Sequence, residues 1–161
     1  MIQKILTSIR DTMQNDKRLS SIQKYHLVDG MLPGGIHPSV CIGCNRLRYS
    51  DYDRDQDEVI APVRIYLYMH DAIAERGEEK IRGLTNDIRY AILANQYLDG
   101  LVDAMTIVEI SFDSTDVSTG QFIHFAAIDV EAKYYEPRRR AQEDLPTVRE
   151  IENEISQEGG Q

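Results

Sequence analysis

The sequence predicts an α+β fold, in which a mixed or antiparallel sheet is packed by an N-terminal helix and one long central helix, with a C-terminal extension. Apolar and polar side chains alternate over residues 63–70, as a half-buried strand requires, because successive side chains point to opposite faces. A single apolar stripe follows over residues 77–100, and a helix with one apolar stripe has to pack it on another element. Segments 105–113 and 121–135 are rich in β-branched and aromatic residues, which favour strands.

The first third of the chain is predicted to add one helix and two strands. Apolar residues recur at helical spacing over residues 2–15, whereas residues 22–28 alternate and are polar enough for a short edge strand. Residues 30–38 hold a Gly-Gly pair and two prolines, which indicate a loop. Residues 40–49 begin apolar and end polar, so we expect a strand that emerges into solvent.

The limits of the remaining elements follow from local signals. The central helix is predicted to begin near Gly77 and to end near Gly100, because glycine commonly ends a helix. Residues 111–120 are polar and predict a hairpin loop, and the strand after them is expected to be the central one. Residues 51–58 carry aspartate at alternate positions, as calcium loops do, but Gln56 stands where such a loop needs glycine, so we expect a plain hairpin.

Residues 138–161 differ in kind from the α+β domain predicted over residues 1–137. A Glu-Pro step ends the last strand, and a short amphipathic helix is predicted beyond it, before a polar end. Two interpretations stay open, namely docking onto this chain or a neighbouring copy, and disorder. The apolar positions that would make the docking contact are Leu145, Val148, Ile151 and Ile155.

Charge and hydropathy limit the function classes. The net charge is −9, from 27 acidic and 18 basic residues, which argues against autonomous nucleic-acid binding. An acidic lining would nevertheless let a DNA duplex slide past, since it repels phosphate. No apolar run approaches the roughly 20 residues of a membrane span, and no signal-peptide layout is present, so we expect a protein made and used in the cytosol without a membrane partner.

No catalytic motif is visible in the sequence, and neither a catalytic residue nor a cofactor is predicted. The sharpest local motif is Cys41-Ile42-Gly43-Cys44, with His37 shortly before it. A redox pair of this kind needs a following helix, and structural zinc usually needs four ligands. Three interpretations stay open: structural thiols, a metal or iron–sulfur ligand pair completed at a subunit interface, and redox work.

One face of the strand over residues 63–70 is a candidate partner interface. Arg64, Tyr66 and Tyr68 share that face, and tyrosine beside arginine is favoured at protein–protein contacts. An ordinary solvated sheet face is the competing interpretation.

The order of these elements resembles a known family. An N-terminal helix and strands lead to Val63-Arg64-Ile65-Tyr66-Leu67-Tyr68, a helix spans residues 78–98, and the domain closes on Val130-Glu131-Ala132-Lys133-Tyr134-Tyr135-Glu136-Pro137. Over residues 1–137 this layout is similar to the tail terminator (tail completion, minor tail protein U-like) proteins of tailed bacteriophages. The likeness lies in the size of the chain, the order of its elements and the general pattern of apolar and polar residues.

The resemblance implies a non-enzymatic α+β protein that assembles as a ring, usually a homohexamer. Such a ring caps the tail tube protein, ends its polymerisation and joins the tail to the head connector or neck, while DNA passes through the lumen without specific binding. It implies a place at the tail–neck junction of the virion after assembly in the host cytoplasm. The Cys41/Cys44 pair and the C-terminal extension depart from the family, and the extension is expected to clasp a neighbouring subunit, a sheath protein or a neck protein.

Other functions compete with this one. A stopper or adaptor of the neck is a close alternative, although adaptors tend to be mostly helical. A small thiol- or metal-binding protein centred on Cys41 and Cys44, or a host regulatory module that binds through its C-terminal helix, would belong to a different class.

Overall fold

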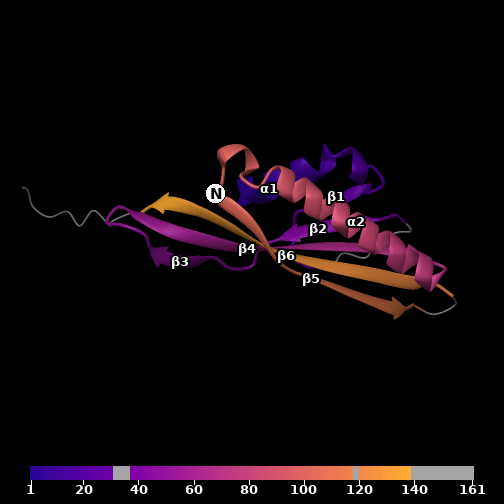
Figure 1. Ribbon diagram of the computed structural model, residues 1–161. Helices are drawn as coiled ribbons and strands as arrows, with labels where there is room; N and C mark the ends of the chain where they lie inside the picture. Colours follow the sequence, from indigo (N-terminus) through magenta and orange to yellow (C-terminus); the bar gives the residue numbers. More distant parts are fainter. Residues whose placement is uncertain (31–36, 118–119, 139–161) are drawn as a thin grey trace, which may run out of the picture.

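The computed structural model describes residues 1–30, 37–117 and 120–138 and contains one six-stranded mixed sheet with two α-helices. Both helices lie on the same face of the sheet, as Figure 1 shows, so the predicted α+β class is confirmed. None of the helices in these described ranges has the length and apolar character needed to cross a membrane.

The sheet has the order β1-β2-β4-β6-β5, with β3 beside the first part of β4. Only the β1–β2 pair is parallel. The helical elements are α1 (Ile2–Gln14), η1 (Lys17–Leu19), α2 (Ala74–Ala94) and η2 (Leu98–Gly100). The strands are β1 (Lys24–His26), β2 (Ser39–Gly43), β3 (Arg48–Asp51), β4 (Gln56–Asp71), β5 (Ala104–Asp116) and β6 (Phe122–Pro137).

The pairing of β4 with β6 forms the backbone of the sheet. Each strand has 16 residues, and the two pair antiparallel along their whole length. Val63, Ile65 and Leu67 of β4 are buried beneath the helices, as the alternation predicted. The prediction that the last strand is central was wrong by one place, because β4 is the middle strand and β6 lies between it and β5.

The strand predicted over residues 40–49 is interrupted. Gly43 pairs with Arg64 and Arg48 pairs with Ile60, so residues 44–47 stand opposite residues 61–63 in a bulge that separates β2 from β3. Glycine is needed where β2 ends, since a Cβ at Gly43 would lie 2.3 Å from the Cα of Asp29. Such a close contact between two backbone segments cannot be inferred from the alternation of apolar and polar residues in the sequence.

The limits of the central helix and of β5 also differ from the prediction. Helix α2 begins at Ala74 and ends at Ala94, so Gly77 lies inside the first turns instead of preceding them. Gly77 is there because α2 packs closely on the sheet, and a Cβ would lie 2.1 Å from His124 Nε2. Strand β5 continues to Asp116, into the segment predicted as a hairpin loop.

Two glycines of α2 give a matched test of this packing. Gly77→Ala is expected to lower the free energy of unfolding by about 1–3 kcal/mol, because the added methyl group overpacks the contact with buried His124. Gly83→Ala in the same helix is expected to raise it by about 0.5–1 kcal/mol, since a Cβ there meets open space. Denaturant unfolding of both variants checks this, and equal effects of the two substitutions would contradict the packing of α2 on His124.

Candidate interaction surface

The sheet face opposite the helices carries a bidentate ion pair beside a tyrosine ring. Arg64 of β4 donates to both carboxylate oxygens of Asp129 on β6, with Nη2 2.8 Å from Oδ2. Its guanidinium also lies 5.8 Å from the centre of the Tyr66 ring. The hydrogen bonds to Asp129, and then the neighbouring Tyr66, raise the pKa of Arg64 above its ordinary value. The Arg64 side chain is still 48% exposed, so the pair leaves charged surface accessible beside the tyrosine ring.

Tyr68 does not belong to this exposed surface. It lies on the same face as Arg64, but it is only 3% exposed and stands between Ser39 and Phe125 on the two neighbouring strands. Burial raises the pKa of its hydroxyl. The period-two pattern assigned the face of Tyr68 correctly, yet it could not show that this end of the face is covered.

Further ion pairs extend the exposed row along β6. Arg48 of β3 donates to Glu131, and Lys133 Nζ lies 3.4 Å from the carboxylate of Glu58. A shallow depression of about 350 Å³ lies beside the row and is lined by Arg64, Tyr66 and neighbouring residues, among them Val108. Val108, at the bulge of β5, is 59% exposed. The surface is therefore a charged, partly aromatic face with an apolar residue at its border.

The far end of the sheet forms an arm beyond the helices. In Figure 1, β3 and the adjoining ends of β4 and β6 run out to the left of the helical layer. Arg138 closes the arm, because its side chain donates to Asp57 and Asp51 at 2.6 Å each. Its backbone N–H also donates to Asp55 O at 2.8 Å. The carboxylates of the 51–58 hairpin thus bind a side chain of the same chain.

The C-terminal residues predicted to make a docking contact lie outside the described residues. These are Leu145, Val148, Ile151 and Ile155. Arg138, the first residue of the predicted extension, lies at the tip of the arm.

The cysteine pair stands at the end of β2. Cys41 is buried within the strand, and Cys44 follows it in the bulge, where its thiol donates to Arg46 O at 3.0 Å. Burial raises the pKa of Cys44, which lowers the fraction of reactive thiolate. In residues 1–30, 37–117 and 120–138, which include His37, no three His, Cys, Asp or Glu side chains are grouped to hold a metal ion.

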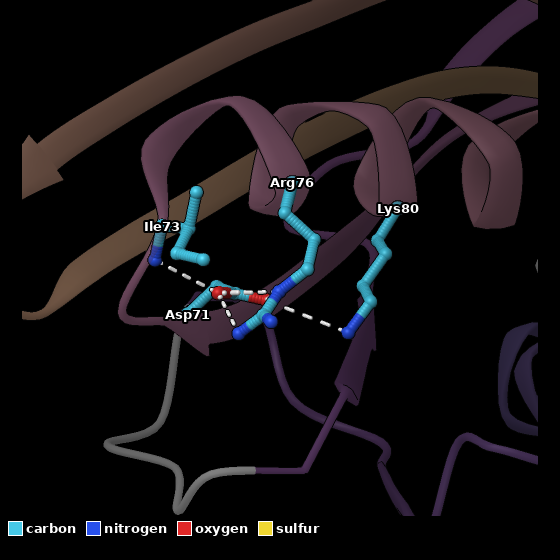
Figure 2. Close-up of polar contacts among 4 residues, drawn as sticks. All are labelled: Asp71, Ile73, Arg76 and Lys80. Carbon is cyan, nitrogen blue, oxygen red and sulfur yellow. Dashed lines mark hydrogen bonds and ion pairs between the residues drawn. The ribbon is translucent and has the colours of Figure 1, made fainter.

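A second polar cluster fixes the turn from β4 into α2, as Figure 2 shows. Asp71 is the last residue of β4, and its side chain is only 4% exposed. It accepts three hydrogen bonds from Arg76, the closest at 2.7 Å, and one from the backbone N–H of Ile73 at 2.9 Å. Lys80, one helical turn beyond Arg76, places its Nζ 3.4 Å from the same carboxylate. These contacts, those of Arg76 foremost, hold the pKa of Asp71 well below its ordinary value.

Sequence reasoning missed two of these contacts. Asp129 was not singled out as the partner of Arg64, because the pairing depends on the register of β4 against β6. The Asp71 cluster had a local signal, since Arg76 and Lys80 are four residues apart and follow an acidic residue at a strand end. Because the helix was predicted to begin at Gly77, Arg76 was placed outside it, and the cluster was not recognised.

Replacing Asp71 by asparagine tests the cluster. At pH 7, Asp71→Asn is expected to lower the free energy of unfolding by about 1–3 kcal/mol, because charged hydrogen bonds to Arg76 are lost. A carboxylate whose pKa is depressed on folding stabilises the fold fully above its unfolded pKa of about 3.9, and this contribution is lost as pH falls through the folded value. The difference from the wild type should therefore narrow below about pH 4.

Denaturant titrations at pH 7 and at acid pH measure this difference. Glu79→Gln removes an exposed carboxylate from α2 and serves as the control. A difference between wild type and Asp71→Asn that stays constant with pH would rule out the depressed pKa as its source.

Similar chains occur among solved structures. No protein-family model and no curated protein sequence matches this chain. A chain in a solved structure titled "Virion of native gene transfer agent (GTA) particle" is similar over 80% of this chain and 94% of that chain, at 7% sequence identity and a TM-score of 0.40.

Proposed function

We propose that the chain is a structural protein of a tailed-phage virion, which assembles as a ring on the end of the tail tube. The ring ends polymerisation of the tube protein and joins the tail to the neck at the tail–neck junction. The protein acts by closing into a ring and by the fit of its surfaces to those of its partners, without catalysis or a bound cofactor. Its partners are other copies of itself, the tube protein and the connector or neck proteins, with a sheath protein as a further candidate.

The observation that carries this proposal is how much of the sheet is left uncovered in the described part of the chain. The helices cover one face, whereas the opposite face exposes the Arg64–Asp129 pair and Tyr66. Exposed arginine and tyrosine are favoured at protein contacts. A sheet with a bare face and a long open edge makes a protein that acts alone prone to aggregation. The same arrangement suits a subunit of an assembly.

The arm and the net charge give further support. Arg138 fixes the start of the C-terminal extension at the arm tip, away from α1 and α2, where a segment can reach a neighbouring copy or a neck protein. The net charge of −9 suits a ring whose lumen lets DNA pass without binding it.

The native mass of the purified protein, together with electron micrographs, tests the proposal. A closed ring of about six copies is the expected result, since symmetric closure is what capping a tube requires. If the protein alone is monomeric, the tube protein is added and the length of its tubes is measured. A chain that forms no ring in either experiment and leaves tube length unchanged would overturn the proposed function.

The Arg64 surface can be tested separately from folding. Arg64→Glu combined with Tyr66→Ala is expected to reduce ring formation by on the order of tenfold or more, because it removes two adjacent contact residues and places like charges at Asp129. The melting temperature should change little, since both side chains lie on the exposed face.

The matched control changes a similar pair on the helical side. Arg89 lies over the Tyr90 ring at 5.7 Å, and both are exposed, so Arg89→Glu with Tyr90→Ala removes the same chemistry elsewhere. Equal losses of assembly in the two double variants would show that the Arg64 surface has no special role.

A further inference from the structure

Strand β5 is a long edge of the sheet. It has 13 residues and pairs with β6 on one side, and no strand of the described residues lies on its other side. Val108 and Phe112 of this strand are exposed large hydrophobic residues. An open edge presents unpaired backbone N–H and C=O groups, which are a template for pairing with another strand. Apolar residues along it add to that tendency.

The charge of β5 selects against pairing with itself. The strand contains Glu109, Asp113 and Asp116 and has no lysine or arginine. Two antiparallel copies of β5 would bring acidic side chains into cross-strand proximity, and like charges in such positions are destabilising. The suitable partner is therefore a strand edge with basic side chains.

The opposite edge of the same sheet has this character. Strand β1 carries Lys24 and His26, with Lys24 exposed and His26 half-buried. Lys24 pairs with Ser39, and Ser39 pairs with Tyr68, which places Lys24 on the helix-free face. His26 lies on the same face, two residues further along β1.

The side chains of β5 divide between the two faces in the matching way. Glu109 pairs with Asp129, the partner of Arg64, so Glu109 lies on the helix-free face, and Asp113 lies there as well. Phe112 pairs with buried Ala126 and so lies on the helix side, where Tyr25 of β1 also lies. Basic residues of one edge and acidic residues of the other therefore share a face, and an aromatic residue of each edge shares the opposite face.

Strand directions also agree with edge pairing. Following the pairs across the sheet, β1 and β5 run in opposite directions. A rotation about an axis along the strands keeps each strand's direction, so β5 of one copy meets β1 of the next antiparallel. The two edges differ, so the contact is head-to-tail, the kind that closes into a ring.

We propose that β1 of one copy adds to β5 of the next and joins the sheets into one continuous band around a ring. With Tyr25 opposite Phe112 in this antiparallel contact, Lys24 lies opposite Asp113, and His26 lies opposite Ser111 and diagonal to Glu109. This assignment rests on the proposed function in that it names the surfaces by which the ring closes. Such a ring covers the part of the β5 edge that β1 reaches, which reduces a site of non-specific aggregation.

Complementary charge reversals test the pairing. One variant carries Lys24→Glu, and the other carries Glu109→Lys with Asp113→Lys. Each variant alone places like charges at every contact, and we expect the protein concentration at half-assembly to rise by on the order of tenfold or more. In an equimolar mixture the two variants can alternate, because one contact then has the wild-type charges and the next has the reversed pair. Native mass should therefore show rings restored in the mixture.

Matched controls change charge away from the two edges. Lys4→Glu on α1 and Glu79→Lys on α2 alter exposed residues of the helical layer and should leave assembly unchanged. Far-UV circular dichroism and melting temperature of each variant separate a loss of assembly from a loss of folding.

The outcomes separate the edge pairing from the proposed function. Rings that form normally from each single variant, or a mixture of folded variants that fails to assemble, would overturn the edge pairing and leave the ring function in place. A wild-type chain that does not self-associate at its highest attainable concentration would also overturn the pairing, and the effect on tube length would then decide the function. The pairing is supported if neither variant alone forms rings and the mixture of the two does. A β5-to-β5 contact would not give this result, because Lys24→Glu would not affect it.

Discussion

The antiparallel pairing of β4 with β6 is the constraint on which the rest of the structure depends. Because side chains alternate along both strands, this single ladder decides which residues face the helices and which stay outside. Its helix side is apolar over most of its length, and α2 packs on it, whereas α1 lies against α2 and β2. Its other side brings Arg64 opposite Asp129, so the exposed ion pair is a product of the same register that forms the core. A slip by one residue would exchange the two sides.

The helical layer is shorter than the sheet, so one part of the sheet is covered by helices and the arm extends beyond them. Under α2 the packing is close enough to require glycine at Gly77, and Asp71 ties the start of that helix to the end of β4. Beyond the helices, no described element forms a second layer on the arm, which is held by strand pairing and by Arg138. The part under the helices fixes the position of the exposed edges and faces, which are the surfaces that the proposed assembly would use.

Much of this fold could be predicted from the sequence, because the strongest patterns belong to the longest elements. The alternation in β4 and the stripe of α2 gave the sheet, the helix and their contact. The errors fall where a contact between distant residues overrides a local signal, as at Gly43 beneath Asp29 and Gly77 beside His124. The polar second half of β5 led to the wrong prediction of a hairpin loop, although this part of the strand is paired with β6. For the candidate interaction surface, alternation predicted that Arg64, Tyr66 and Tyr68 share one face, but it could not show that Tyr68 is buried there.

The closure of the arm by Arg138 has a mechanical consequence. Tension along the arm on the chain beyond Arg138 passes first into its bonds with Asp51 and Asp57, which belong to β3 and β4. It then acts along the length of β6, parallel to the strands, so the paired residues on both neighbours resist together instead of separating one after another. A tether anchored in this way transmits force into the whole sheet. The joint between head and tail that we propose would need this property.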